Sequence, residues 1–105
     1  MAIKNTRLQQ HPTVTTISEP LSTDSAIVNM FFCNLSENVE YINVHIVKSG
    51  ESADDKNKVL NLIPIDPQNT FSFGADKLVL SAGDTVWAST TTTDQVSATI
   101  SYVVM

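Results

Sequence analysis

The sequence has few of the residues that build covalent frameworks, phosphate-binding loops or membrane spans. Cys33 is the only cysteine among 105 residues, so no intrachain disulfide can form and packing must stabilise the fold. There are only three glycines, and no phosphate-binding loop motif is present. No apolar run approaches the roughly 20 residues of a membrane helix, and the start of the chain lacks the apolar core of a signal peptide. We therefore expect a product of the cytoplasm with no membrane partner.

Charged residues are scarce as well. They make up 16% of the chain, and the formal net charge is −5. A nucleic-acid partner requires a basic surface that neutralises phosphates, so we expect none here. Apolar residues make up 42%, which is typical of a folded domain. Much of the surface must then consist of hydroxyl and amide groups, which are cheaper to desolvate than charges and suit contacts between proteins.

No group of residues has the spacing of a catalytic or metal site. His11 and His45 are the only histidines, and no Gly-x-Ser-x-Gly sequence is present to hold a nucleophilic serine. The acidic residues of the loop 49–58 do not follow the spacing of a calcium loop, and lysines come directly after them. We therefore expect a protein that is not an enzyme, with no catalytic residue, no cofactor and no metal.

Most of the chain shows the apolar period of two that is typical of β-strands. In residues 41–48, Ile42, Val44 and Ile46 share one face, and residues 95–104 alternate in the same way. Turn residues separate the strands, which predicts a single antiparallel β-sandwich of about eight short strands, immunoglobulin-like or jelly-roll-like. The other strands are expected over 13–17, 25–34, 59–65, 71–73, 78–80 and 85–89, and the core is expected to contain Val44, Ile46, Val86, Ile100 and Tyr102.

The strand 25–34 is apolar on both faces. If its even-numbered residues face the core, then Ile27, Phe31 and Cys33 point away from it. Loops, the N-terminal segment or another subunit would cover that second face. Ile27 and Phe31 are therefore candidate interface residues, whereas the cysteine is expected to be a buried, structural thiol.

Trp87 has the parity of an outward residue, because Val86 and Ala88 are expected to face the core. Either a neighbouring loop or a partner would cover its indole ring. Tryptophan is enriched at interfaces, so Trp87 is also a candidate interface residue. Pro64 and Pro67 interrupt the pattern of the preceding strand, which indicates an edge strand or a bend.

Residues 1–12 differ from the rest, because they are polar and basic in an otherwise acidic chain. We expect them to form an extended N-terminal arm that leads into a sandwich domain of residues 13–105. The arm would contact an acidic surface of its own domain or of a neighbour; the alternative is a frayed terminus. Its candidate contact residues are Ile3, Lys4, Arg7 and Leu8.

Three segments carry a resemblance to a known family. Residues 26–34 are an apolar run that closes on asparagine, and residues 44–50 are a strand that ends in a Lys-Ser-Gly turn. Residues 78–89 contain Leu-x-Leu-x-x-Gly-Asp-Thr followed by a hydrophobic residue. In this order and spacing they resemble a family of small virion structural proteins of tailed bacteriophages, cyanophages included. The likeness spans roughly residues 13–103.

The resemblance implies a non-enzymatic structural subunit of a phage particle, either a capsid decoration (cement) protein or a neck, tail or baseplate component. It would be made in the host cytoplasm, reside in the virion, and bind other virion structural proteins and copies of itself. Gly83 and Asp84 match the family motif in structural roles, the glycine in a turn and the aspartate as an acceptor for backbone amides. The alternative is a module on the virion that binds a host receptor or glycan, for which Trp87 and Tyr41 would be the aromatic residues.

Overall fold

The computed structural model of the chain describes residues 2–10, 15–18 and 23–104, with side chains except at 2, 15–18 and 75–77. The described residues form eight strands and one short 3-10 helix, as the predicted sandwich requires. The strands are β1 (Ala2–Arg7), β2 (Thr15–Ser18), β3 (Ser25–Asn34), β4 (Glu40–Val47), β5 (Lys58–Ile65), β6 (Thr70–Leu80), β7 (Thr85–Ser89) and β8 (Val96–Val104), and the 3-10 helix is η1 (Asp55–Asn57).

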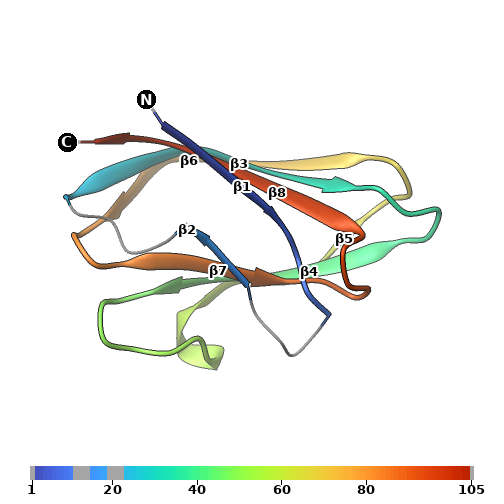
Figure 1. The fold of residues 1–105 in the computed structure, drawn as a ribbon, viewed down its shortest axis with the longest axis horizontal. Helices are drawn as coiled ribbons and strands as arrows, with labels where there is room; N and C mark the ends of the chain where they lie inside the picture. The colour runs from blue at the N-terminus through green and yellow to red at the C-terminus, as the bar shows by residue number, and fades with distance from the viewer. Residues whose placement is uncertain (1, 11–14, 19–22, 105) are drawn as a thin grey trace.

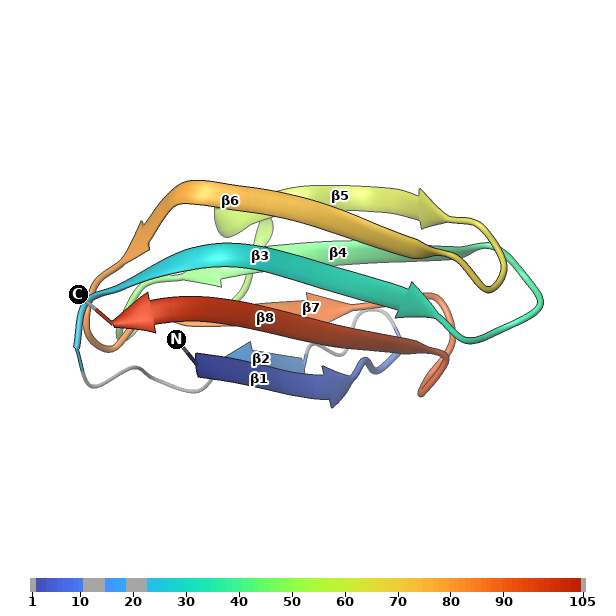
Figure 2. The same ribbon diagram turned by 90° about the horizontal axis from the view of Figure 1, so that it is seen from above.

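The strands form two four-stranded sheets, in the orders β1-β8-β3-β6 and β2-β7-β4-β5, and hydrogen-bonded strands are antiparallel. The chain crosses from one sheet to the other at every connection except the one between β4 and β5. This connectivity is that of a jelly roll and not of the immunoglobulin fold. Figures 1 and 2 show the sheets stacked face to face, with both termini near the same end of the molecule.

The hydrophobic core lies between the two sheets. Four of the residues predicted for it, Val44, Val86, Ile100 and Tyr102, are buried, and the fifth, Ile46, is half-buried against it. The remaining large apolar side chains that are buried are those of Leu8, Ile27, Met30, Phe32, Ile42, Val47, Ile65, Leu80 and Val96.

The prediction that Ile27 points away from the core is wrong. Opposite β8, the two steps of β3 from Ile27 to Asn29 match a single step, from Tyr102 to Ser101, so Val28 is an extra residue in a β-bulge. Opposite β6, the same two steps match four, from Leu78 to Gly74, so the two extra residues there belong to β6. The extra residue places Ile27 and Met30 on the same side, and Ile27 is only 1% exposed. Phe31 keeps the outward orientation that the alternation predicts. The alternation of residues in the sequence does not reveal a bulge, because a bulge depends on how the strand pairs with its neighbours in the sheet.

The N-terminal segment is also placed differently from the predicted arm. Residues 2–7 pair with β8 as the edge strand β1, and Leu8 is fully buried in the core. The sandwich therefore begins well before the predicted boundary at residue 13. The segment joins the sheet because β8 offers it unpaired main-chain groups and Leu8 supplies an apolar anchor. Residues 11 and 12, the end of the predicted arm, lie outside the described residues.

Two further details of the strands follow from the pairing. β5 is the edge strand of its sheet, which confirms the interpretation of Pro64. Residues 71–73 and 78–80, expected as separate strands, belong to the single strand β6, whose pairing is irregular opposite the bulge of β3.

In the turn between β6 and β7, the Asp84 carboxylate accepts from Ser49 N at 3.0 Å and from Ser81 N at 2.9 Å, the structural role that the motif implies.

At the opposite end of the sandwich, the buried side chain of Asn34 connects two loops. Its Nδ2 donates to the carbonyl oxygens of Asn38 at 2.8 Å, Ile65 at 2.9 Å and Asp66 at 3.2 Å. Its Oδ1 accepts from Ser36 N at 2.8 Å. These bonds hold the β3–β4 and β5–β6 loops against each other, since both loops cross between the sheets at this end.

Candidate assembly surface

The outward side of the sheet β1-β8-β3-β6 follows from its register. Residues directly opposite each other on antiparallel strands share a face of the sheet. Met30 pairs with Ile100, and both are buried, so this row faces the core. The next row, which contains Phe31 and Thr99, therefore faces outward. Figure 2 looks onto this side of the molecule, with the second sheet behind.

We call this side the outer face. It consists of four rows of residues that the pairing places side by side across the sheet. The rows are Arg7, Ser97, Cys33 and Thr70; Asn5, Thr99, Phe31 and Ser72; Ile3, Ser101, Asn29 and Gly74; and Val103, Ala26 and Val79.

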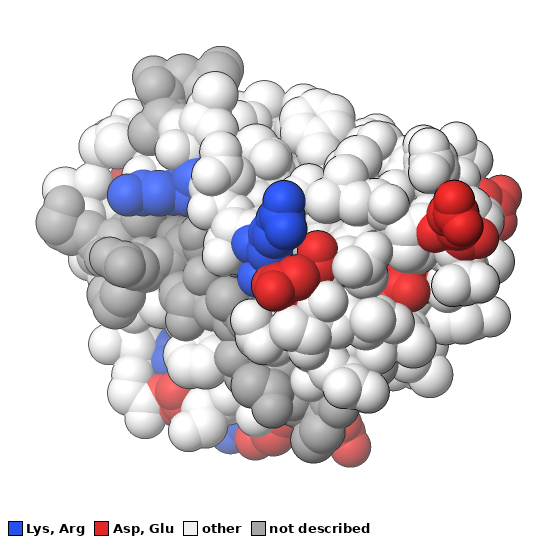
Figure 3. Space-filling view, turned by 45° about the vertical axis from the view of Figure 1, so that its right-hand side comes forward, with Lys and Arg blue, Asp and Glu red and all other residues white. Residues whose placement is uncertain are grey.

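The outer face is almost free of charge. Among its outward positions with described side chains, Arg7 is the single charged residue and no position is acidic. Most other positions carry hydroxyl, amide or small apolar groups. Figure 3 views the sandwich from the side and not onto the outer face, and the Lys, Arg, Asp and Glu side chains visible there cover only small parts of the surface. The outer face can therefore be covered by another protein without the desolvation of many charges.

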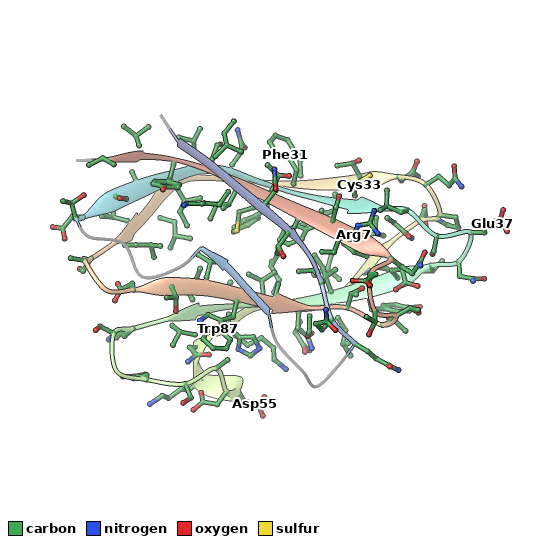
Figure 4. The ribbon with its side chains drawn as sticks, viewed as in Figure 1. Arg7, Phe31, Cys33, Glu37, Asp55 and Trp87 are labelled. Atoms are coloured by element: carbon green, nitrogen blue, oxygen red, sulfur yellow. The ribbon has the colours of Figure 1, made fainter. Side chains whose placement is uncertain are left out.

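Phe31 occupies the middle of the outer face. It lies on β3, one of the two inner strands, and is 40% exposed. Its neighbours across the sheet are Ser72 on β6 and Thr99 on β8, both with short side chains. Figure 4 shows the phenyl ring projecting away from the second sheet. Cys33 lies two residues further along the same side and is half-buried, so it is more accessible than the predicted buried thiol.

The structure brings together three of the predicted interface residues and separates the others. Ile3 and Arg7 from β1 lie on the outer face with Phe31 from β3, and β8 runs between the two strands. Leu8 and Ile27 are core residues instead, because the apolar side chain of each is enclosed between the sheets.

Lys4 has a different position from its neighbours on β1. It pairs with Ile100, so it belongs to a row that faces inward, yet it is exposed because β1 is the edge of the sheet. A charged side chain at an inward position of an edge strand hinders the addition of another strand. The sheet is therefore protected at this edge and open on its outer face.

Trp87 lies on the other sheet, where the register places it beside His45. It is half-buried, and its Nε1 donates to Thr85 Oγ1 at 2.6 Å. The loop between β4 and β5 reaches this side of the sheet, since His45 Nδ1 lies 3.0 Å from Asp54 O and 2.9 Å from Asn57 Oδ1. This loop also buries His45, although His45 lies on the side of β4 opposite to the core-facing Val44.

The second sheet carries the only aromatic residues considered for glycan binding. Tyr41 is 42% exposed on β4, and the polar edge of Trp87 is already bonded within the chain. A surface pocket of about 210 Å³ beside His45 is lined by Asn43, Ala53, Asp54, Asp55, Lys58 and Ser89. Among the residues that the structure describes, no group of three or more His, Cys, Asp and Glu is arranged to hold a metal ion. In the same part of the chain, no helix is long and apolar enough to cross a membrane.

Sequence reasoning missed most of the outer face. The polar side of β8, formed by Ser97, Thr99 and Ser101, is visible in the sequence as the alternate positions of an apolar strand. No local signal shows that this strand lies between β1 and β3, or that Val79 of β6 lies in the row of Val103.

The comparisons with known proteins gave matches among solved structures alone. No protein-family model and no curated protein matches the chain. Six chains of solved structures do, among them a chain of the T13 IBDV viral particle, an icosahedral virus. That chain and the present one align with a TM-score of 0.47 and 10% sequence identity, over 99% of this chain and 29% of the viral one. The present chain thus spans less than a third of the viral chain's length.

Proposed function

We propose that this protein is a non-enzymatic structural subunit of a tailed-phage particle, either a capsid decoration protein or a component of the neck, tail or baseplate. The observation that carries the proposal is an eight-stranded jelly roll whose outer face carries one charge, Arg7, among its described positions. Jelly rolls build viral capsid domains, although lectins and cupins use the fold as well, so the fold alone does not decide the function. The outer face adds the capacity to assemble.

The composition of the outer face supports an assembly role. Protein interfaces exclude most charges from their centre, because an unpaired charge is costly to bury. Here the centre is Phe31 among serine and threonine, and the single described charge is an arginine at the rim, Arg7. The net charge of −5 of the whole chain favours the solubility of the free subunit before it assembles.

The tailed-phage part of the proposal rests on the resemblance of residues 26–34, 44–50 and 78–89 to that family of virion proteins. In the structure these segments are β3, the end of β4 with its turn, and the β6–β7 connection. These segments lie in both sheets, so the resemblance is spread over the fold and is not confined to one local turn.

Cryo-EM of the phage particle tests this proposal. We expect density for the chain in repeated copies, with Phe31 and Thr99 buried against a neighbouring subunit. Mass spectrometry of the purified particles should detect the chain in proportion to the copy number in the map. Particles that lack the chain would refute a structural role. A map in which the outer face is open to solvent would refute the role of that face.

A further inference from the structure

We propose that the outer face binds the outer face of a second copy of this chain, in a two-fold dimer in which the two Phe31 side chains meet near the axis. The inference deepens the proposed function by naming the partner of this face. The inference depends on the charge, the area and the side chains of the outer face, and not on which particle contains the protein.

The distribution of charge favours a second copy at this face. Every copy carries a net charge of −5, so two copies repel each other wherever their acidic surfaces meet. The exposed acids Glu51, Asp54 and Asp55 lie in the loop that covers the second sheet, and Glu37 and Asp66 lie in loops at one end of the sandwich. The outer face has no acid among its described positions, so contact there brings two copies together with the least repulsion.

The size of the face meets the requirement for a dimer. Four strands spaced ~4.8 Å apart, with about eight residues of ~3.3 Å each, give an area of roughly 500 Å² per copy. Two copies would bury about 1,000 Å², which is near the lower limit of a stable interface. We therefore expect a reversible dimer whose population rises with protein concentration.

The geometry favours contact between faces over the extension of a sheet. Lys4 at the edge of β1 hinders the pairing of this edge with another strand. On the outer face, Ser72, Gly74 and Thr99 surround Phe31 with short side chains, so a second sheet can approach closely around the ring. A two-fold contact places the centre of one face on the centre of the other, and the central aromatic residue then contributes most to binding.

Sedimentation velocity over a wide range of protein concentration tests the dimer. As the protein concentration increases, we expect the average mass of the sedimenting species to rise from that of the 11.5 kDa monomer to twice that value. Phe31→Lys and Ser72→Glu alter exposed side chains, so both variants should keep the circular dichroism spectrum of the parent, and each should raise the dissociation constant about tenfold or more. Tyr41→Lys is the matched control, because Tyr41 is an aromatic of similar exposure, 42%, on the other sheet; it should dimerise as the parent does.

Cys33 supplies a second readout, since it lies two residues from Phe31 on the same face. The rate of its reaction with a thiol reagent should fall as the protein is concentrated, and Phe31→Lys should abolish that dependence. A parent protein that stays monomeric at the highest concentration would overturn the inference, and so would a dimer that Phe31→Lys and Ser72→Glu leave intact. A monomer that is nevertheless incorporated into particles would overturn the dimer alone, whereas a dimer absent from particles would overturn only the proposed function.

Discussion

Gly83 approaches Ser49 so closely that a Cβ atom at position 83 would lie 2.8 Å from Ser49 Oγ and 2.9 Å from Ser49 Cβ. The φ angle of Gly83 is +92°, which favours glycine in its own right. The next residue, Asp84, accepts a hydrogen bond from the main-chain nitrogen of the same serine. The β6–β7 turn is therefore held against the start of the β4–β5 loop at Ser49, and both residues of the Gly-Asp pair contribute to this contact.

Gly83→Ala should lower the free energy of unfolding by about 2–4 kcal/mol, because the substitution adds a steric clash to an unfavourable φ. Gly50→Ala is the matched control. Gly50 also has a positive φ, +83°, but a Cβ there would meet no atom within 4 Å, so we expect a loss of only about 1 kcal/mol. Urea denaturation of both variants measures the difference. If the two variants lose the same free energy of unfolding, the close approach of Gly83 to Ser49 does not affect stability.

Leu8→Ala and Ile3→Ala compare the loss of a buried and of an exposed apolar side chain in the N-terminal segment. Leu8 is fully buried in the core, so its truncation should lower the free energy of unfolding by about 2–5 kcal/mol. Ile3 is 64% exposed on β1, and its truncation should change stability by less than about 0.5 kcal/mol. Thermal or chemical denaturation at a low protein concentration provides the measurement. If Leu8→Ala is as mild as Ile3→Ala, the segment is a free arm and not part of the sandwich.

Asn34→Asp should be strongly destabilising at neutral pH. The carboxylate has the shape of the amide but cannot donate, and it would face three carbonyl oxygens that now accept from Nδ2. A loss of about 3 kcal/mol or more is expected for a buried, unpaired charge. Asn69→Asp, at an exposed position in a neighbouring loop, is the control and should cost less than about 0.5 kcal/mol.

The destabilisation by Asn34→Asp should also depend on pH. At acid pH a protonated carboxyl at position 34 can donate one hydrogen bond, so the stability difference between Asn34→Asp and the parent should shrink as the pH falls. Denaturation curves of both proteins at the same series of pH values test this. A difference that is constant with pH would show that the introduced carboxyl is solvated, and that the loops have moved apart around it.

His45 should be the Nδ1–H tautomer when its ring is neutral. Its Nδ1 lies 3.0 Å from the carbonyl oxygen of Asp54, which can only accept, so the proton must be on this nitrogen. Long-range proton–nitrogen NMR spectra distinguish the two ring nitrogens directly. Asn57→Ala removes the second acceptor but leaves the carbonyl, and should preserve the tautomer. Observation of Nε2–H in the parent would contradict the observed packing of the β4–β5 loop against His45.

The strands themselves were predictable because the alternation that defines them is local. The predicted strand 25–34 coincides with β3, and 85–89 coincides with β7, since turn residues mark both ends of each. The exposure of Phe31 also follows from the alternation. The inward orientation of Ile27 does not, because the bulge at Val28 arises from the pairing of β3 with β8, which is distant in the sequence.

By itself, the sequence determined that this chain is a β-sandwich with few charges, an acidic balance and a glycine-aspartate turn between β6 and β7. Only the tertiary structure decided that the sandwich is a jelly roll, that residues 2–7 join the sheet, and that Ile3, Arg7 and Phe31 share one face with few charges. The physical reason is that side-chain alternation depends on neighbouring residues in the chain. The order of strands depends instead on which distant segments bury their apolar sides together, and that choice is made by the whole fold.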